Sequence, residues 1–197
     1  MVPVKRLSLA KSRLASYGDE RRQALALAFA CDVVFAACQV AKVLVVTDDD
    51  VAAVALSALG ARVVADDPDA GLNPALTHGA ELLRREDPSL GVATLSADLP
   101  ALLPADLLAA LAQVPEGGRG FVADTGGSGT TLLAAGPGAV LLPAYGPDSR
   151  AGHLASGAAE LDAAEGLRRD VDTPADLEAA ALLGLGRHTR LAARGLW

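Results

Sequence analysis

Four cationic side chains lie close together at the start of the sequence. Lys5, Arg6, Lys11 and Arg13 follow a short apolar segment, in a chain whose formal net charge is −7. A strand end followed by a turn that presents Lys and Arg can bind a polyphosphate, because backbone N–H groups and cationic side chains converge on one small volume. The alternative is a solvated basic turn.

Acidic residues occur at two places where a metal ion could be held. Asp98 lies three residues after the apolar segment 92–95, while Asp170 and Asp172 precede the last predicted helix. Two carboxylates from separate segments, completed by waters and substrate phosphates, are a usual way to bind Mg2+. The alternatives are that Asp98 is a turn residue before Pro100 and that Asp172 or its neighbour Thr173 caps the helix.

Two further segments are suited to binding an anion. The glycine-rich stretch 124–131 and the turn 145–149 both offer backbone N–H groups and hydroxyls, as in anion-binding nests. A flexible hairpin is the alternative for the first. Neither a P-loop nor a Gly-x-Gly-x-x-Gly dinucleotide motif is present. The histidines, His78, His153 and His188, show no metal-ligand spacing, and we expect a structural role for His153.

The elements that must position these residues alternate between strand and helix patterns. Strands are predicted at 2–4, 42–47, 61–65, 91–96, 120–124 and 130–135, and helices at 19–39, 50–59, 74–85, 104–113 and 174–183. This order predicts an α/β fold: a three-layer, mostly parallel sheet with an antiparallel edge around 124–131. Ligands of such sheets bind beyond the carboxyl ends of the strands.

Composition excludes several classes of protein. The 197 residues fit one domain. Hydrophobic residues make up 51% of the chain, yet no apolar run reaches the roughly 18 residues that span a membrane. With no signal-peptide pattern, we expect a cytoplasmic protein. The acidic balance and 3% aromatic content argue against a nucleic-acid surface. Cys31 and Cys38 are too far apart on one helix for a disulfide. The oligomeric state stays open.

Six ordered segments together resemble a known family. They are Val-Pro-Val-Lys-x-Leu-x-x-Ala-Lys-Ser-Arg-Leu at 2–14, Gly-Leu-Asn-x-Ala at 71–75, Asp-Leu-Pro at 98–100, Gly-Thr-Thr at 129–131, Tyr-Gly-x-x-Ser at 145–149 and Asp-Val-Asp-Thr-Pro-x-Asp-Leu at 170–177. Over nearly the whole chain they are similar to the guanylyltransferases of coenzyme F-420 biosynthesis. That family has the GT-A-like nucleotidyltransferase fold. It joins GTP to a three-carbon phosphoacid, phosphoenolpyruvate in actinobacteria or 2-phospho-L-lactate in methanogens.

The resemblance implies roles for individual residues. The Mg2+ ligands are Asp98 and Asp172, and Asp170 is left without a firm role because the family motif contains both acids. The triphosphate faces Lys5, Lys11 and Arg13; the guanine and ribose end is lined by Gly71, Leu72 and Asn73; the phosphoacid is gripped at Thr131, Gly146 and Ser149. Catalysis rests on Lys11, Arg13, Asp98 and Asp172.

Other functions stay open at this point. A molybdopterin guanylyltransferase or sugar-phosphate nucleotidyltransferase usually opens with a Gly-Gly-x-Ser-x-Arg-Met loop, which this sequence lacks. A GTP-binding module without turnover has less need of two metal-binding carboxylates. Of the 17 cationic residues only three are lysines, a bias typical of GC-rich actinobacterial genomes that favours phosphoenolpyruvate. Relatives carry apolar residues before the Val2 segment, so either the first strand is short or the given start of the sequence is late.

Overall fold

The computed structural model describes residues 1–66 and 70–196. Strands and helices alternate along the chain, as the sequence pattern predicts. The strands are β1 (Val2–Pro3), β2 (Leu44–Val46), β3 (Arg62–Val64), β4 (Val92–Leu95), β5 (Arg119–Ala123), β6 (Thr130–Ala135) and β7 (Ala159–Glu160). The α-helices are α1 (Asp19–Cys38), α2 (Asp50–Ser57), α3 (Leu72–Glu86), α4 (Pro104–Leu111), α5 (Ser149–Ala155), α6 (Glu165–Arg168), α7 (Pro174–Leu183) and α8 (Arg187–Ala192), and η1 (Leu7–Leu9) and η2 (Ser12–Tyr17) are 3-10 helices.

The strands form a parallel sheet and a mixed sheet that lie next to each other. The first has the order β1-β2-β3 and the second the order β4-β6-β5-β7. A backbone hydrogen bond of 2.9 Å from Leu95 N–H to the Met1 carbonyl links β4 to the start of β1. The predicted α/β class is confirmed. The antiparallel strand β6 lies between β4 and β5, inside the sheet rather than at the edge where we expected it.

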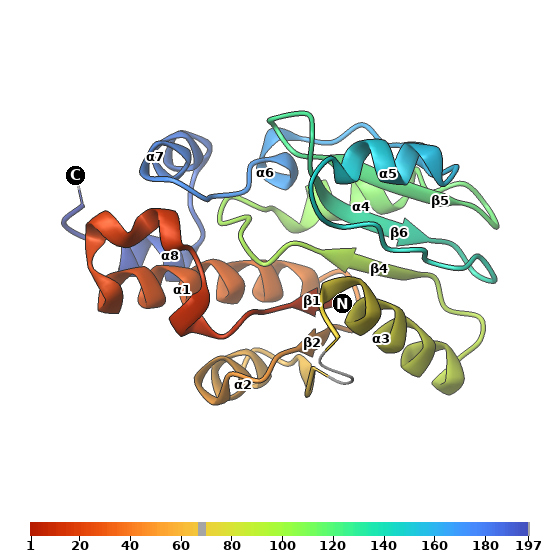
Figure 1. The fold of residues 1–197 in the computed structure, drawn as a ribbon, viewed down its shortest axis with the longest axis horizontal. Helices are drawn as coiled ribbons and strands as arrows, with labels where there is room; N and C mark the ends of the chain where they lie inside the picture. Colours follow the sequence, from red (N-terminus) through yellow and green to blue (C-terminus); the bar gives the residue numbers. More distant parts are fainter. Residues whose placement is uncertain (67–69, 197) are drawn as a thin grey trace.

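Helices cover both faces of the sheets, which gives three layers (Figure 1). On one face, Val45, Leu95 and Leu132 pack with residues of α1, α2 and α4 in the largest buried cluster. On the other face, Leu44 and Phe121 join a second cluster that includes Ala80 of α3. Alternate residues of one strand thus point to opposite helical layers, as pleated strands require.

A third apolar cluster fastens the C-terminal helices to the first helix. Leu25 and Phe29 of α1 pack against Leu177 of α7 and Ala193, just after α8, and Figure 1 shows α7 and α8 beside the N-terminal half of α1. Val171 belongs to the same cluster and is fully buried. The buried Val171 side chain therefore anchors the segment that carries Asp170 and Asp172.

The sequence pattern missed the short strand β7 and the short helices η1, η2, α5, α6 and α8. None exceeds seven residues, and such segments have too few turns to show a helical period. Cys31 and Cys38 are free thiols, as predicted, and burial followed by the Asp32 charge raises the pKa of Cys31 to about 11. Within the described residues, no helix is long and apolar enough to cross a membrane.

Candidate active site

The cationic and acidic segments meet at the carboxyl end of β4. Asp98 follows β4 by three residues, and Lys11 follows β1 on the neighbouring side. Val171 N–H donates to the Asp98 carbonyl at 3.0 Å, which holds Asp170 and Asp172 against the same loop. Three segments that are far apart in sequence are thereby brought to one point, in the position that ligands of parallel sheets occupy.

The Lys11 ammonium lies between two carboxylates. Its Nζ donates to Asp172 Oδ1 at 2.7 Å and also to Asp98 Oδ2. Burial lowers the pKa of Lys11, but the attraction of Asp98 and Asp172 outweighs it, so the pKa is raised and the ammonium stays charged. The backbone of Lys11 has φ +53°, a left-handed conformation that non-glycine residues rarely adopt and that is concentrated at functional sites.

One carboxylate oxygen of this centre has no partner. Asp98 Oδ1 is buried and forms no hydrogen bond with any part of the chain that the structure describes. Arg13 lies at the rim, with its guanidinium 3.4 Å from Asp172 Oδ2. A buried oxygen without a donor and a second carboxylate within reach of the same cation fit a hard metal ion such as Mg2+. Among the described residues no cluster of three or more ligating side chains exists, so water or substrate oxygens would have to complete the coordination shell.

Asp170 is the third acid of this centre. Burial raises its pKa to about 7, with further contributions from the charges of Asp98, Asp172 and Asp124, while Lys11 acts in the opposite direction. The sequence suggested Asp172 rather than Asp170 as the ligand. It is Asp172, and not Asp170, that shares the Lys11 ammonium with Asp98.

The predicted nucleotide segment begins α3. Gly71 precedes the helix with φ +96°, and Leu72 is 44% exposed at its first position. The Asn73 carboxamide, in contrast, is bonded to the protein: Nδ2 donates to the Tyr145 carbonyl at 2.9 Å and Oδ1 accepts from Tyr145 N–H at 2.8 Å. Lys5 is exposed and makes no hydrogen bond or ion pair within the described chain.

The predicted phosphoacid segments lie side by side, but their side chains differ in availability. Arg150 N–H donates to the Ser128 carbonyl at 3.0 Å, which joins the 145–149 turn to the glycine-rich loop. Gly146 is exposed with φ +144°, and Ser149 is buried at the start of α5. The Thr131 hydroxyl is buried and donates to the Leu167 carbonyl at 2.7 Å. Its bond thus runs to the segment before the acidic residues.

Three residues near the site escaped the sequence analysis or were assigned no part in it. His153 is fully buried; its Nδ1 lies 2.9 Å from Thr130 Oγ1 and its Nε2 accepts from Ala144 N–H at 3.0 Å. Burial and then Arg119 lower its pKa. Both ring nitrogens are bonded within the protein, as the expected structural role requires. The Arg168 guanidinium donates to the carbonyls of Ala123 and Asp124. Tyr145 is the first residue of the Tyr-Gly-x-x-Ser motif at 145–149, so that motif could have drawn attention to it.

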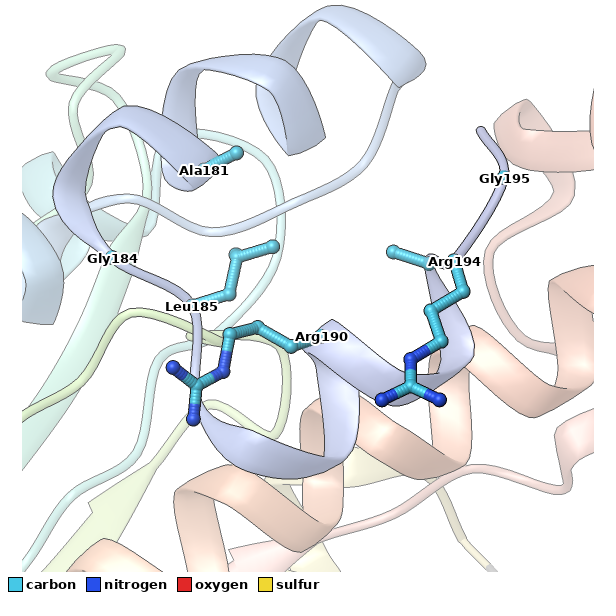
Figure 2. A pocket seen from close by; sticks show the side chains of 7 residues that line it. Ala181, Gly184, Leu185, Arg190, Arg194 and Gly195 are labelled. Atoms are coloured by element: carbon cyan, nitrogen blue, oxygen red, sulfur yellow. The ribbon is translucent and has the colours of Figure 1, made fainter. Parts of the chain in front are cut away.

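One hollow of the surface lies away from this centre. It has a volume of about 340 Å3 and lies between α7 and α8, lined by Leu185, Arg190, Arg194 and small residues. Figure 2 shows both arginines on α8 and the segment after it, beyond the end of α7. None of the residues of the acidic centre lines it.

The fold is the GT-A-like fold of solved nucleotidyltransferase structures. A protein assigned as a nucleotide-diphospho-sugar transferase from Desulfovibrio desulfuricans superposes with a TM-score of 0.65, covering 90% of this chain and 83% of its own, at 15% identity. A nucleotidyl transferase from Methanothermobacter gives a TM-score of 0.57 over 92% and 96% of the two chains, at 18% identity. At such identities the likeness establishes the fold alone.

Sequence comparison identifies the family. The family described as "Guanylyl transferase CofC like" matches residues 1–194, and the chain belongs to it. A phosphoenolpyruvate guanylyltransferase of Thermomonospora curvata is 57% identical over 98% of this chain and 88% of its own length. One of Streptomyces avermitilis is 54% identical over 100% and 94%. The family expected from the six segments is confirmed.

Proposed function

We propose that this guanylyltransferase joins GTP to phosphoenolpyruvate, releasing pyrophosphate and enolpyruvoyl-2-diphospho-5'-guanosine for coenzyme F-420 biosynthesis. The observation that carries the proposal is the Lys11 ammonium between Asp98 and Asp172, with Arg13 beside it. The full-length identity with relatives named for this reaction supports the choice of substrates.

The reaction needs no covalent intermediate with the protein. A phosphate oxygen of phosphoenolpyruvate attacks the α-phosphorus of GTP in line; a new P–O bond forms as the bond to the β-phosphate oxygen breaks, and pyrophosphate leaves with the electron pair. The protein contributes positioning and charge neutralisation. Lys11 and Arg13 lie at the acidic centre and would stabilise that charge, and the exposed Lys5 would add to the basic segment.

Asp98 and Asp172 would hold the Mg2+ ion, as the resemblance implies. A bound Mg2+ neutralises charge on the phosphates and orients them. The unpartnered Asp98 Oδ1 supports this assignment. The Lys11 side chain has a flexible four-carbon stem, so its ammonium can exchange a carboxylate oxygen for a phosphate oxygen as substrate arrives.

The two substrate ends are assigned to neighbouring segments. Gly71 and Leu72 at the start of α3 line the guanine and ribose end. Gly146, Ser149 and Thr131 form the phosphoacid end, although the Thr131 hydroxyl donates to the Leu167 carbonyl. The contact between Arg150 and Ser128 supports a single phosphoacid pocket made of both loops.

Pyrophosphate release tests the proposal. The purified protein is incubated with GTP and Mg2+, with phosphoenolpyruvate, with 2-phospho-L-lactate, or with no phosphoacid, and ATP and CTP replace GTP in parallel. We expect release only with GTP plus phosphoenolpyruvate, and loss of activity on chelation of the metal. Preference for 2-phospho-L-lactate would replace the phosphoacid; activity with a molybdopterin or sugar phosphate instead would overturn the reaction; GTP binding without release would leave a GTP-binding module.

A further inference from the structure

We propose that Asn73 is a positioning residue that sets the phosphoacid turn from the nucleotide end of the site. The inference rests on the proposed function for the identity of the two ends. It gives Asn73 a task other than the direct contact with guanine or ribose that the resemblance implies, and it makes the two substrate ends mechanically dependent on each other.

Both polar atoms of the Asn73 carboxamide bind one residue. Nδ2 donates to the Tyr145 carbonyl at 2.9 Å while Oδ1 accepts from the Tyr145 N–H at 2.8 Å, across 72 residues of sequence. Two antiparallel bonds to the donor and acceptor of one residue fix the orientation of its backbone as well as its position. An amide is required, since a carboxylate lacks the donor and a hydroxyl cannot bridge both atoms.

Tyr145 is held on its other sides by the core of the protein. Its hydroxyl is hydrogen-bonded to Thr94 Oγ1 of β4, and its ring packs edge-on against His153 at a centroid distance of 5.3 Å. His153 in turn accepts from Ala144 N–H. Tyr145, the first residue of the phosphoacid turn, is therefore held by side chains of α5 and β4, and its backbone is held by Asn73 of α3.

Beyond Tyr145 the backbone leaves the common conformations. Gly146 has φ +144° and Asp148 has φ +55°, and both precede Ser149. A turn of this kind persists when its surroundings over-determine it. The Asn73 pair is the contact that holds the Tyr145 backbone directly before these residues. Its loss should loosen the Gly146–Ser149 backbone while α3 and the sheet stay intact.

The same pair connects the two substrate ends. Asn73 directly follows Gly71 and Leu72, so a ligand that orders the start of α3 also orders Tyr145. By linkage, GTP then raises the affinity for the phosphoacid and the phosphoacid raises the affinity for GTP by the same factor.

The test compares Asn73→Ala and Asn73→Asp with Thr77→Ala. Thr77 is the matched control because its hydroxyl bonds only the Asn73 carbonyl within α3, at 3.0 Å. We expect both Asn73 variants to raise the KM for phosphoenolpyruvate about tenfold, as the loss of a two-bond contact implies, with the KM for GTP changed less than threefold. The control should behave as wild type. A rise confined to the KM for GTP would overturn the proposal in favour of direct nucleotide contact.

Amide hydrogen exchange provides a readout that needs no activity. In the Asn73 variants, peptides covering 144–149 should exchange faster, while those covering β6 should not. Should the wild type prove inactive with GTP and phosphoenolpyruvate, the proposed function fails but this exchange still decides the role of Asn73. Unchanged exchange over 144–149 in both variants would overturn the positioning role. Asn73→Asp keeps the size and the acceptor, so it covers the case in which the alanine variant does not fold.

Discussion

The Asp32 carboxylate of α1 and the Asp98 carboxylate after β4 are both largely buried, but they are bound by different kinds of partner. Asp32 accepts from His188 N–H and Nδ1, both at 2.9 Å, and from Thr189 N–H at 2.8 Å. These donors belong to the first turn of α8 and cannot leave without unfolding it. Asp98 has one oxygen on the Lys11 ammonium and one without a partner.

The difference separates a structural carboxylate from one available for chemistry. Fixed backbone donors saturate Asp32, and Gly186 packs so closely that an added Cβ would lie 2.2 Å from the Asp32 Cγ. Asp98 instead depends on a single charge at the end of a flexible stem, which can be exchanged. Burial alone therefore does not identify a functional acid; the mobility of its partners does.

The largest expected effect is a loss of turnover when Asp98 or its partner acid Asp172 is replaced. Asp98→Asn and Asp172→Asn should each lower turnover by about a hundredfold or more, because each removes one charge of the pair that we propose holds the metal. Circular dichroism should show an intact fold. Turnover is measured as pyrophosphate release, and near-normal rates in both variants would remove the metal assignment.

The opposite outcome is expected for Asp32→Ala. Removing its carboxylate leaves buried N–H groups of α8 without an acceptor, at a cost of about 2–3 kcal/mol in the free energy of unfolding. Denaturant titrations, at a temperature where the variant is folded, should show this decrease in the free energy of unfolding. The folded variant should keep its turnover within a few fold, and a hundredfold loss there would erase the distinction drawn between the two acids.

The smallest effect concerns the rim of the site. Arg13 is 72% exposed and 3.4 Å from Asp172, so Arg13→Ala should raise the KM for GTP by several fold, as expected for a partly screened charge contact. Lys42→Ala removes an exposed cation before β2, far from the basic segment in sequence, and serves as the control. Equal effects of the two substitutions would mean that overall charge, rather than this position, attracts the nucleotide.

Much of this arrangement was predictable from local patterns. The apolar segment before Asp98 ends at the carboxyl edge of a strand because polar residues follow directly, and the Asp172 segment precedes a helix that Thr173 caps through a reciprocal pair with Asp176. Contacts between distant segments leave no such pattern. Neither the Asn73–Tyr145 pair nor the Asp32 contact with α8 produces a periodic pattern in the sequence. Nothing in the sequence around Lys11 indicates that Asp98 and Asp172 share its ammonium group.

The separation of the site residues along the chain has a consequence for biosynthesis. Lys11 and Asp98 are 87 residues apart, and Lys11 and Asp172 are 161 residues apart. Lys11 and Asp98 leave the ribosome long before Asp172, and the helices α7 and α8 that anchor the Asp172 segment emerge last. Contacts of such span form late in folding, because the chain must first be closed over long loops. The nascent chain therefore completes its acidic centre only near the end of translation, and fragments that stop before α7 should have no cation-binding centre of this kind.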